Sequence, residues 1–250
     1  MREWIIGRNP VYEVLRAGRR HSFRLQVAQG VQEKGRLSEI IRLCSIRNVL
    51  VERVPRQRLD ALGDGHQGVA LEASRYPYSA LEDMLELAER RNEPPFLLIL
   101  DALQDPQNLG SLLRTAEIVG VHGAVLPLRH TATVTPAVVS ASSGASEHLL
   151  VAQANLAQTI TALKEEGVWV IGLEAGPQAQ YPSQVRLDGP LALVVGSEGQ
   201  GMRPLVRDSC DLLLRLPMRG QVDSLNAAVA GSIALYLAWQ ARRFAGFSED

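Results

Sequence analysis

Short, almost wholly apolar segments alternate with longer helical patterns over the last two thirds of the chain, and this alternation constrains the fold more than any other feature. Phe96–Leu100 and Leu191–Val195 are uninterrupted apolar runs of strand length, and further mainly apolar segments lie at 123–126, 168–173 and 212–216. Strands that are apolar on both faces are typical of parallel sheets covered by helices on both sides. The sequence therefore predicts an α/β fold with a parallel sheet for this part of the chain.

The beginning of the chain predicts a smaller, separate α/β domain. Helical and strand patterns alternate there in short segments, at 9–17, 23–28, 37–45, 48–54 and 66–73. Tyr76-Pro77-Tyr78 then interrupts both periodicities, as a linker does. We expect a first domain over 1–74, a linker and connecting helix over 75–95, and a second domain over 96–250.

The two parts differ in charge. Up to Tyr76 the chain has 14 lysines and arginines against 8 acidic residues, and beyond it 12 against 19. A basic domain is typical of contact with a polyanion such as a nucleic acid. Scattered charges more often mark a solvated face, so this signal needs support from elsewhere in the sequence.

Composition also argues against several classes of protein. Cys44 and Cys210 each lie in an apolar pattern, and the five histidines show no ligand spacing, so we expect neither a disulfide nor a metal site. No apolar run is long enough to span a membrane, and the first residues lack the apolar stretch of a secretory signal. We therefore expect a cytoplasmic protein without membrane contact.

Polar residues follow the first apolar strand, in a loop that contains Asn108 and Gly110. We expect a helix from Ser111 to Val119 after this loop. Asn108 would then lie at the helix entrance, and Arg114 would project from an early turn. On this loop alone, an N-cap beside a surface arginine explains the pattern equally well.

A second loop, Gly196–Met202, is rich in glycine and follows the apolar run Leu191–Val195. Glycine lets the backbone approach a ligand closely or adopt positive φ. The loop lacks the lysine of a triphosphate site, and Glu198 would repel a pyrophosphate. It suits a cofactor with positive character, such as S-adenosylmethionine, or a carboxylate that caps backbone amides.

A third loop runs from Leu216 to Asn226 and precedes a long helix from Ala227 to about Arg243. Ser224 alone predicts an N-cap. Asn226 is expected in the first turn, where asparagine has a poor helix propensity. We therefore expect its side chain to make a contact outside the helix.

Taken together, the three loops resemble the sequence motifs of the SpoU (TrmH) family of RNA ribose 2′-O-methyltransferases in the SPOUT superfamily. The matching residues are Asn108-x-Gly110-x-x-x-Arg114, Gly196-Ser197-Glu198-Gly199-x-Gly201-Met202, and Leu216-Pro217-Met218 with Ser224-Leu225-Asn226. Residues 1–74, with Ile6-Gly7-Arg8-Asn9-Pro10-Val11 and His66-Gln67-Gly68-Val69, are similar to the family's N-terminal substrate-binding domain. That domain is found on the branch that methylates guanosine in large-subunit ribosomal RNA.

The resemblance implies an RNA-binding N-terminal domain and a C-terminal SPOUT-type sheet with a trefoil knot, in which S-adenosylmethionine binds. It implies a homodimer in which Arg114 reaches the site across the interface. The cofactor-binding residues it implies are Gly196, Leu216, Met218 and Leu225, and the catalytic residues are Asn108, Arg114, Glu198, Ser224 and Asn226.

Arg114 has a side-chain pKa above about 12 and stays protonated, so it is a poor general base. Our hypothesis is that Arg114 clamps the target phosphate or stabilises developing alkoxide charge, while Ser224 and Asn226 orient the hydroxyl. The motifs leave the proton acceptor open.

The sequence thus predicts an enzyme that methylates the ribose 2′-OH of a guanosine in 23S ribosomal RNA. A transfer-RNA ribose methyltransferase shares the three loops and is one alternative. A non-catalytic RNA-binding ribosome-assembly factor is another, although a binding module has no need of the five polar residues. A nucleotide-dependent dehydrogenase has little support, because no GxGxxG turn follows an early strand.

Overall fold

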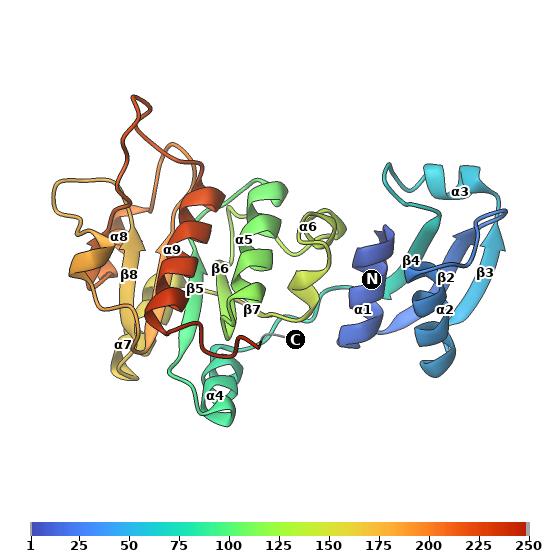
Figure 1. Ribbon diagram of the computed structural model, residues 1–250, viewed down its shortest axis with the longest axis horizontal. Coiled ribbons are helices and arrows are strands. Elements are labelled where there is room, and N and C mark those ends of the chain that lie inside the picture. The colour runs from blue at the N-terminus through green and yellow to red at the C-terminus, as the bar shows by residue number, and fades with distance from the viewer. Residues whose placement is uncertain (1, 249–250) are drawn as a thin grey trace. The chain divides into compact units, whose positions relative to one another are not determined.

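The computed structural model describes residues 2–248, which form two compact units. The first unit comprises the chain up to Pro77 together with Val134–His148. The second comprises Tyr78–Thr133 and the chain from Leu149 onward. Figure 1 shows the elements of both units.

The first unit is a four-stranded mixed sheet covered by short helices. Its strand order is β1-β4-β2-β3, with β4 antiparallel to β1 and β2, and β2 parallel to β3. The strands are β1 (Arg2–Ile6), β2 (Ser22–Ala28), β3 (Leu50–Val54) and β4 (Val69–Ser74). The helices are α1 (Arg8–Ala17), α2 (Arg36–Ile46), α3 (Arg56–Asp60), α6 (Pro136–Ala141) and the 3₁₀ turn η1 (Ala145–Glu147). The small N-terminal α/β domain expected from the sequence is confirmed.

A buried ion pair joins the later segment, Val134–His148, to the rest of the first unit. The Arg20 guanidinium donates from Nε and Nη2 to the Glu147 carboxylate at 2.8–3.1 Å, and both side chains are 0% exposed. Arg20 Nη1 also donates to Glu3 Oε2 at 3.0 Å. The sequence did not anticipate this segment, because it predicts one uninterrupted domain over 96–250. The domain boundaries that we expect after residues 74 and 95 stay a prediction.

The second unit is a six-stranded, wholly parallel sheet in the order β10-β8-β9-β5-β6-β7. Its strands are β5 (Phe96–Leu100), β6 (Gly123–Pro127), β7 (Leu150–Ala154), β8 (Trp169–Leu173), β9 (Leu191–Val195) and β10 (Leu212–Leu214). The two apolar runs that we took for strands, β5 and β9, are buried along their whole length. The predicted parallel sheet is confirmed.

Helices cover this sheet, and two of them begin at loops that carry predicted site residues. They are α4 (Leu81–Arg91), α5 (Pro106–Ile118), α7 (Leu156–Glu165), α8 (Pro204–Ser209), α9 (Ala227–Ala241) and the 3₁₀ turn η2 (Pro182–Gln184). Helix α5 begins five residues earlier than expected, because Asp105 caps it by accepting from Gln107 N–H at 3.0 Å and Pro106 occupies the first turn. Helix α9 begins at Ala227, as expected.

Parallel strands bring their carboxyl ends to one edge of the sheet, where ligands of open α/β proteins bind. The loops after β5, β8, β9 and β10 therefore gather at one edge of this unit. The trefoil knot that the resemblance implies stays a prediction. Among residues 2–248, no helix is long and apolar enough to cross a bilayer.

Candidate functional site

A cavity of about 920 Å³ lies in the second unit, at the carboxyl ends of β8, β9 and β10. Its walls come from the end of β8 and the two residues after it, from the glycine-rich loop after β9, from Arg207 of α8, and from the chain between the end of β10 and the beginning of α9. All four predicted cofactor residues line it, together with three of the predicted catalytic residues: Gly196, Leu216, Met218 and Leu225, and Glu198, Ser224 and Asn226. The second and third motifs thus form one site.

The glycine-rich loop closes on itself beside the cavity. Ser197 and Gly201 exchange two backbone hydrogen bonds, each of 3.0 Å. A Cβ atom at Gly196 would lie 2.3 Å from the backbone carbon of Gly201, so no side chain fits there without opening the turn. Gly196 therefore has a conformational role in holding Glu198 at the cavity wall.

Two side-chain amides and one carboxylate form a cluster at the N-terminus of α9. We call these three residues, Asn108, Glu198 and Asn226, the amide–carboxylate cluster. Glu198 Oε1 accepts from Asn108 Nδ2 at 3.0 Å and from Asn226 Nδ2 in a closer contact. Asn226 Nδ2 also donates to Asn108 Oδ1 at 3.1 Å. Asn108 and Asn226, which are 118 positions apart in the chain, thus orient the carboxylate of Glu198.

Asn226 is the N-cap of α9. Its Oδ1 accepts from Val229 N–H at 3.1 Å, the contact that a capping asparagine makes to the third helical residue. This corrects two expectations, because Asn226 precedes the first turn and Ser224 does not cap the helix. The expected contact outside the helix is present through Nδ2.

Ser224 and Leu225 line the cavity from an exposed stretch of chain. Leu225 is 41% exposed and Met218 is 45% exposed, although both are apolar. Exposed apolar side chains beside a cavity are typical of a surface that a ligand covers.

Arg114 is placed differently from the other predicted residues. It is an exposed side chain of α5 and is absent from the described residues that line the cavity. Helix α5 packs against α9, where Thr115 Oγ1 and Ser232 Oγ lie 2.9 Å apart. The structure therefore joins Asn108 to Glu198 and Asn226, and leaves Arg114 outside the cavity of its own chain.

Three charged residues of the cavity wall were missed by the sequence analysis. Glu174 Oε1 accepts from Arg207 Nε at 2.8 Å, and this hydrogen bond and the carboxylate charge raise the pKa of Arg207. The Arg215 guanidinium lies 4.2 Å from the centre of the Tyr181 ring. Glu174 follows an apolar strand directly, and this position was the available signal in the sequence. In the part of the chain that the structure describes, no group of three metal-ligating side chains comes together.

Comparisons with known proteins identify the family of this chain. The model of the SpoU rRNA Methylase family matches residues 95–236, and that of RNA 2′-O ribose methyltransferase substrate binding matches residues 4–79. A putative TrmH family tRNA/rRNA methyltransferase of Bacillus subtilis (strain 168), YacO, is 43% identical over 248 residues, which are 98% of each chain.

Two solved structures share the fold over nearly the whole chain. The SpoU methyltransferase AviRb from Streptomyces viridochromogenes, in complex with the cofactor AdoMet, has a TM-score of 0.80 at 21% identity and covers 98% of this chain and 92% of its own. An AdoMet-bound rRNA methyltransferase from Sinorhizobium meliloti has a TM-score of 0.77 at 24% identity and covers 99% and 88%.

Proposed function

Because this chain belongs to the SpoU family of RNA methyltransferases, we propose that it transfers a methyl group from S-adenosylmethionine to the ribose 2′-OH of a guanosine in 23S ribosomal RNA. The observation that carries the proposal is the cavity, which brings together residues of the second and third motifs. The basic first unit, matched by a substrate-binding family, supports a large structured RNA as substrate. A cytoplasmic location stays a prediction.

The residues of the cavity fit S-adenosylmethionine. Leu173, Val195 and Leu216 offer apolar surface to a nucleobase. Glu198 offers negative charge to the sulfonium group, and Glu174 offers a carboxylate acceptor to the ribose hydroxyls of the cofactor. When bound, the cofactor supplies a methyl group on a positively charged sulfur.

The amide–carboxylate cluster positions Glu198 for the reacting hydroxyl. Both amide groups donate to Oε1, and within residues 2–248 the second oxygen, Oε2, has no hydrogen-bond partner. Glu198 lines the cavity, so Oε2 can accept a hydrogen bond from a ribose hydroxyl placed there. Ser224, on the same wall, helps to hold that hydroxyl, and Arg114 contacts the adjacent phosphate.

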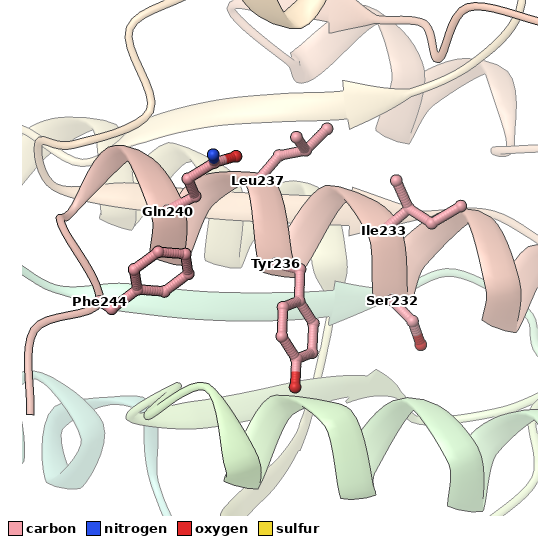
Figure 2. A pocket seen from close by; sticks show the side chains of 6 residues that line it. All are labelled: Ser232, Ile233, Tyr236, Leu237, Gln240 and Phe244. Carbon is pink, nitrogen blue, oxygen red and sulfur yellow. The ribbon is translucent and has the colours of Figure 1, made fainter. Parts of the chain in front are cut away.

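The protein is proposed to act as a homodimer through the exposed face of α5 and α9. Figure 2 shows the side chains that line a hollow on α9 and just after it: Ser232, Ile233, Tyr236, Leu237, Gln240 and Phe244. The volume of this hollow is about 410 Å³. On the same pair of helices Ile118 is 50% exposed and Val229 is 47% exposed. Several exposed apolar side chains on two neighbouring helices are typical of a protein interface.

We assign this face to a second copy of the chain, because Arg114 lies on α5 and outside the cavity of its own chain. A two-fold interface puts the same face of each chain against the other, so α5 of each copy approaches the neighbouring α9. That arrangement brings each Arg114 to its partner's cavity.

Tyr236→Glu is expected to separate the dimer and to lower methyl transfer at least tenfold, since it places a charge in the centre of an apolar interface. Sedimentation velocity gives the oligomeric state, and a methylation assay gives the rate. Trp169→Glu is the matched control, because Trp169 is also exposed, at 58%, but lies at the start of β8. A Tyr236→Glu protein that remains dimeric would refute the assignment of this face.

Glu174→Gln is expected to weaken S-adenosylmethionine binding about tenfold. A carboxylate at the end of the strand beside the glycine-rich loop is suited to accept hydrogen bonds from ribose hydroxyls, and a charged hydrogen bond contributes about 1.5–3 kcal/mol. Calorimetry with S-adenosylhomocysteine measures the affinity without turnover. Glu165→Gln, at an exposed acid of α7, should leave the affinity unchanged, and equal affinities for the two variants would contradict this role of Glu174.

The activity itself is tested with labelled S-adenosylmethionine and total RNA, followed by mapping of the methylated nucleotide. We expect label on the 2′-O of a guanosine in 23S ribosomal RNA. The printed name of the Bacillus subtilis relative includes both tRNA and rRNA, so transfer RNA is the alternative substrate. Label confined to transfer RNA would replace our proposal with that alternative.

A further inference from the structure

The connections between elements of the first unit meet at one edge of its sheet. In the strand register, Ile6 pairs with Ala70, Val27 with Val69, and Ala28 with Val54. Strands β1, β2 and β3 therefore end at the edge where β4 begins. We call this surface the loop edge, and it comprises residues 7–9, 29–35 and 55–68.

Hydrogen bonds join the loops of this edge into one surface. Arg8 donates from its backbone N–H to Gln67 Oε1 at 3.1 Å and from Nε to the Gln67 carbonyl at 3.2 Å. His66 is buried, and its Nδ1 accepts from Gly68 N–H at 2.9 Å. Because the imidazole and the Arg8 side chain brace the segment around Gln67, the loop is held in a defined shape.

The charges of the loop edge leave an excess of cations. Arg8, Lys34 and Arg58 have no carboxylate within ion-pair distance among residues 2–248, and Lys34 and Arg58 are exposed. Three acids lie on this surface, and two of them are engaged, since Glu33 pairs with Arg53, and Asp60 lies 2.9 Å from His66 Nε2. The third, Asp64, is exposed and offsets one of the three cations. Positive charge is therefore available here for a ligand.

Several cations elsewhere in the first unit are engaged in holding the fold. Arg20 is buried against Glu147. Arg24 lies between Glu72, at 2.8 Å, and Glu52, at 3.5 Å. The loop edge is thus a part of this unit where uncompensated cations and exposed polar backbone coincide.

Three glycines expose backbone at the loop edge. Gly30 and Gly65 have φ of +79° and Gly35 has φ of +57°, and nothing lies within 4 Å of a Cβ atom built on any of them. A phosphate or a base can therefore approach the backbone N–H groups of these loops closely.

We propose that the loop edge binds the phosphate backbone of RNA, with Arg8, Lys34 and Arg58 as the contacting cations. This inference rests on the proposed function, which supplies RNA as the substrate. Guanidinium and ammonium groups contact phosphates without reading sequence, so the surface fixes the position of the RNA. Buried His66 and the Gln67 backbone position Arg8 for this contact.

The test compares two full-length variants that each lose three positive charges. The first carries Arg8→Gln, Lys34→Gln and Arg58→Gln. The control carries Arg16→Gln, Arg42→Gln and Arg47→Gln, which lie on α1 and α2 or at the end of α2. Filter binding to a 23S ribosomal RNA transcript between 50 and 200 mM salt gives the dissociation constant and its salt dependence.

The loop-edge variant is expected to bind at least tenfold more weakly, with a log–log salt slope shallower by about 2–3, since each phosphate contact contributes about 0.7–0.9. The control should keep nearly the wild-type slope. A double variant, Lys34→Gln with Arg58→Gln, tests the same surface without touching the Arg8–Gln67 hydrogen bonds. Circular dichroism and S-adenosylhomocysteine binding should be unchanged in all three.

Equal losses in the two triple variants would show that RNA responds to net charge alone and would overturn the proposal. So would a wild-type protein that does not bind the transcript at 50 mM salt. If the proposed function were wrong but this inference right, the outcome would differ. RNA binding would still depend on the loop edge, while no methyl group would be transferred to the RNA.

Discussion

Asn226→Ala is expected to slow methyl transfer by about 10²–10³-fold, the range found when one preorganised hydrogen-bond donor is removed from an active site. The variant deletes the Nδ2 group that donates to both Glu198 and Asn108. Glu198 then keeps a single amide donor and is no longer fixed at the cavity wall. Single-turnover methylation of RNA at saturating cofactor measures the effect on the chemical step.

The same substitution removes the cap of α9, which costs about 1 kcal/mol of stability. Asn226→Ser separates the two roles, because serine caps helices well but carries no amide donor. Asn155→Ala is the matched control, since Asn155 caps α7 through bonds to Ala157 and Gln158 N–H and lies outside the cavity. We expect both Asn226 variants to lose methylation and Asn155→Ala to keep it. Full activity in Asn226→Ser would show that Asn226 acts only as a helix cap.

The parallel sheet, and the meeting of the second and third motifs at one edge of it, followed from the sequence for a physical reason. A strand buried on both faces is apolar at every position, so β5 and β9 are visible without any partner. The loops after such strands share one edge, which is why the second and third motifs meet at one cavity.

The capping of α9 was predicted less well, because local propensity cannot choose between neighbouring caps. Ser224 and Asn226 both precede the helix, and asparagine and serine cap about equally well. The choice depends on Glu198 and Asn108, which engage the Asn226 amide from distant loops. Tertiary contacts thus decide what a single sequence window leaves open.

The segment Val134–His148 was not predicted to join the first unit, and the reason lies in one contact. Arg20 and Glu147 are 127 positions apart. The sequence around each of them predicts an ordinary surface charge, since arginine and glutamate are rarely buried unless paired. Only the folded chain shows that each is the other's partner.

Glu147→Ala is accordingly expected to destabilise the first unit by about 3–5 kcal/mol. It leaves the Arg20 guanidinium buried with only part of the negative charge that compensates it. Glu3 still accepts from Arg20 Nη1, but its side chain is 20% exposed and does not replace the buried carboxylate. Urea unfolding followed by circular dichroism measures the loss. Hydrogen exchange should show faster opening of residues 134–148.

Glu39→Ala is the control, because its pair with Arg36 at 2.7 Å has both side chains at least 40% exposed, and such pairs contribute only about 0–1 kcal/mol. The double variant Arg20→Met with Glu147→Leu tests the same contact in a second way. Apolar residues of similar size often replace a buried ion pair at little cost, so the double variant should be more stable than Glu147→Ala. If Glu147→Ala instead unfolds like Glu39→Ala, the buried pair does not hold the later segment in the first unit. The coupling between Arg20 and Glu147 therefore measures how firmly residues 134–148 are held in the first unit.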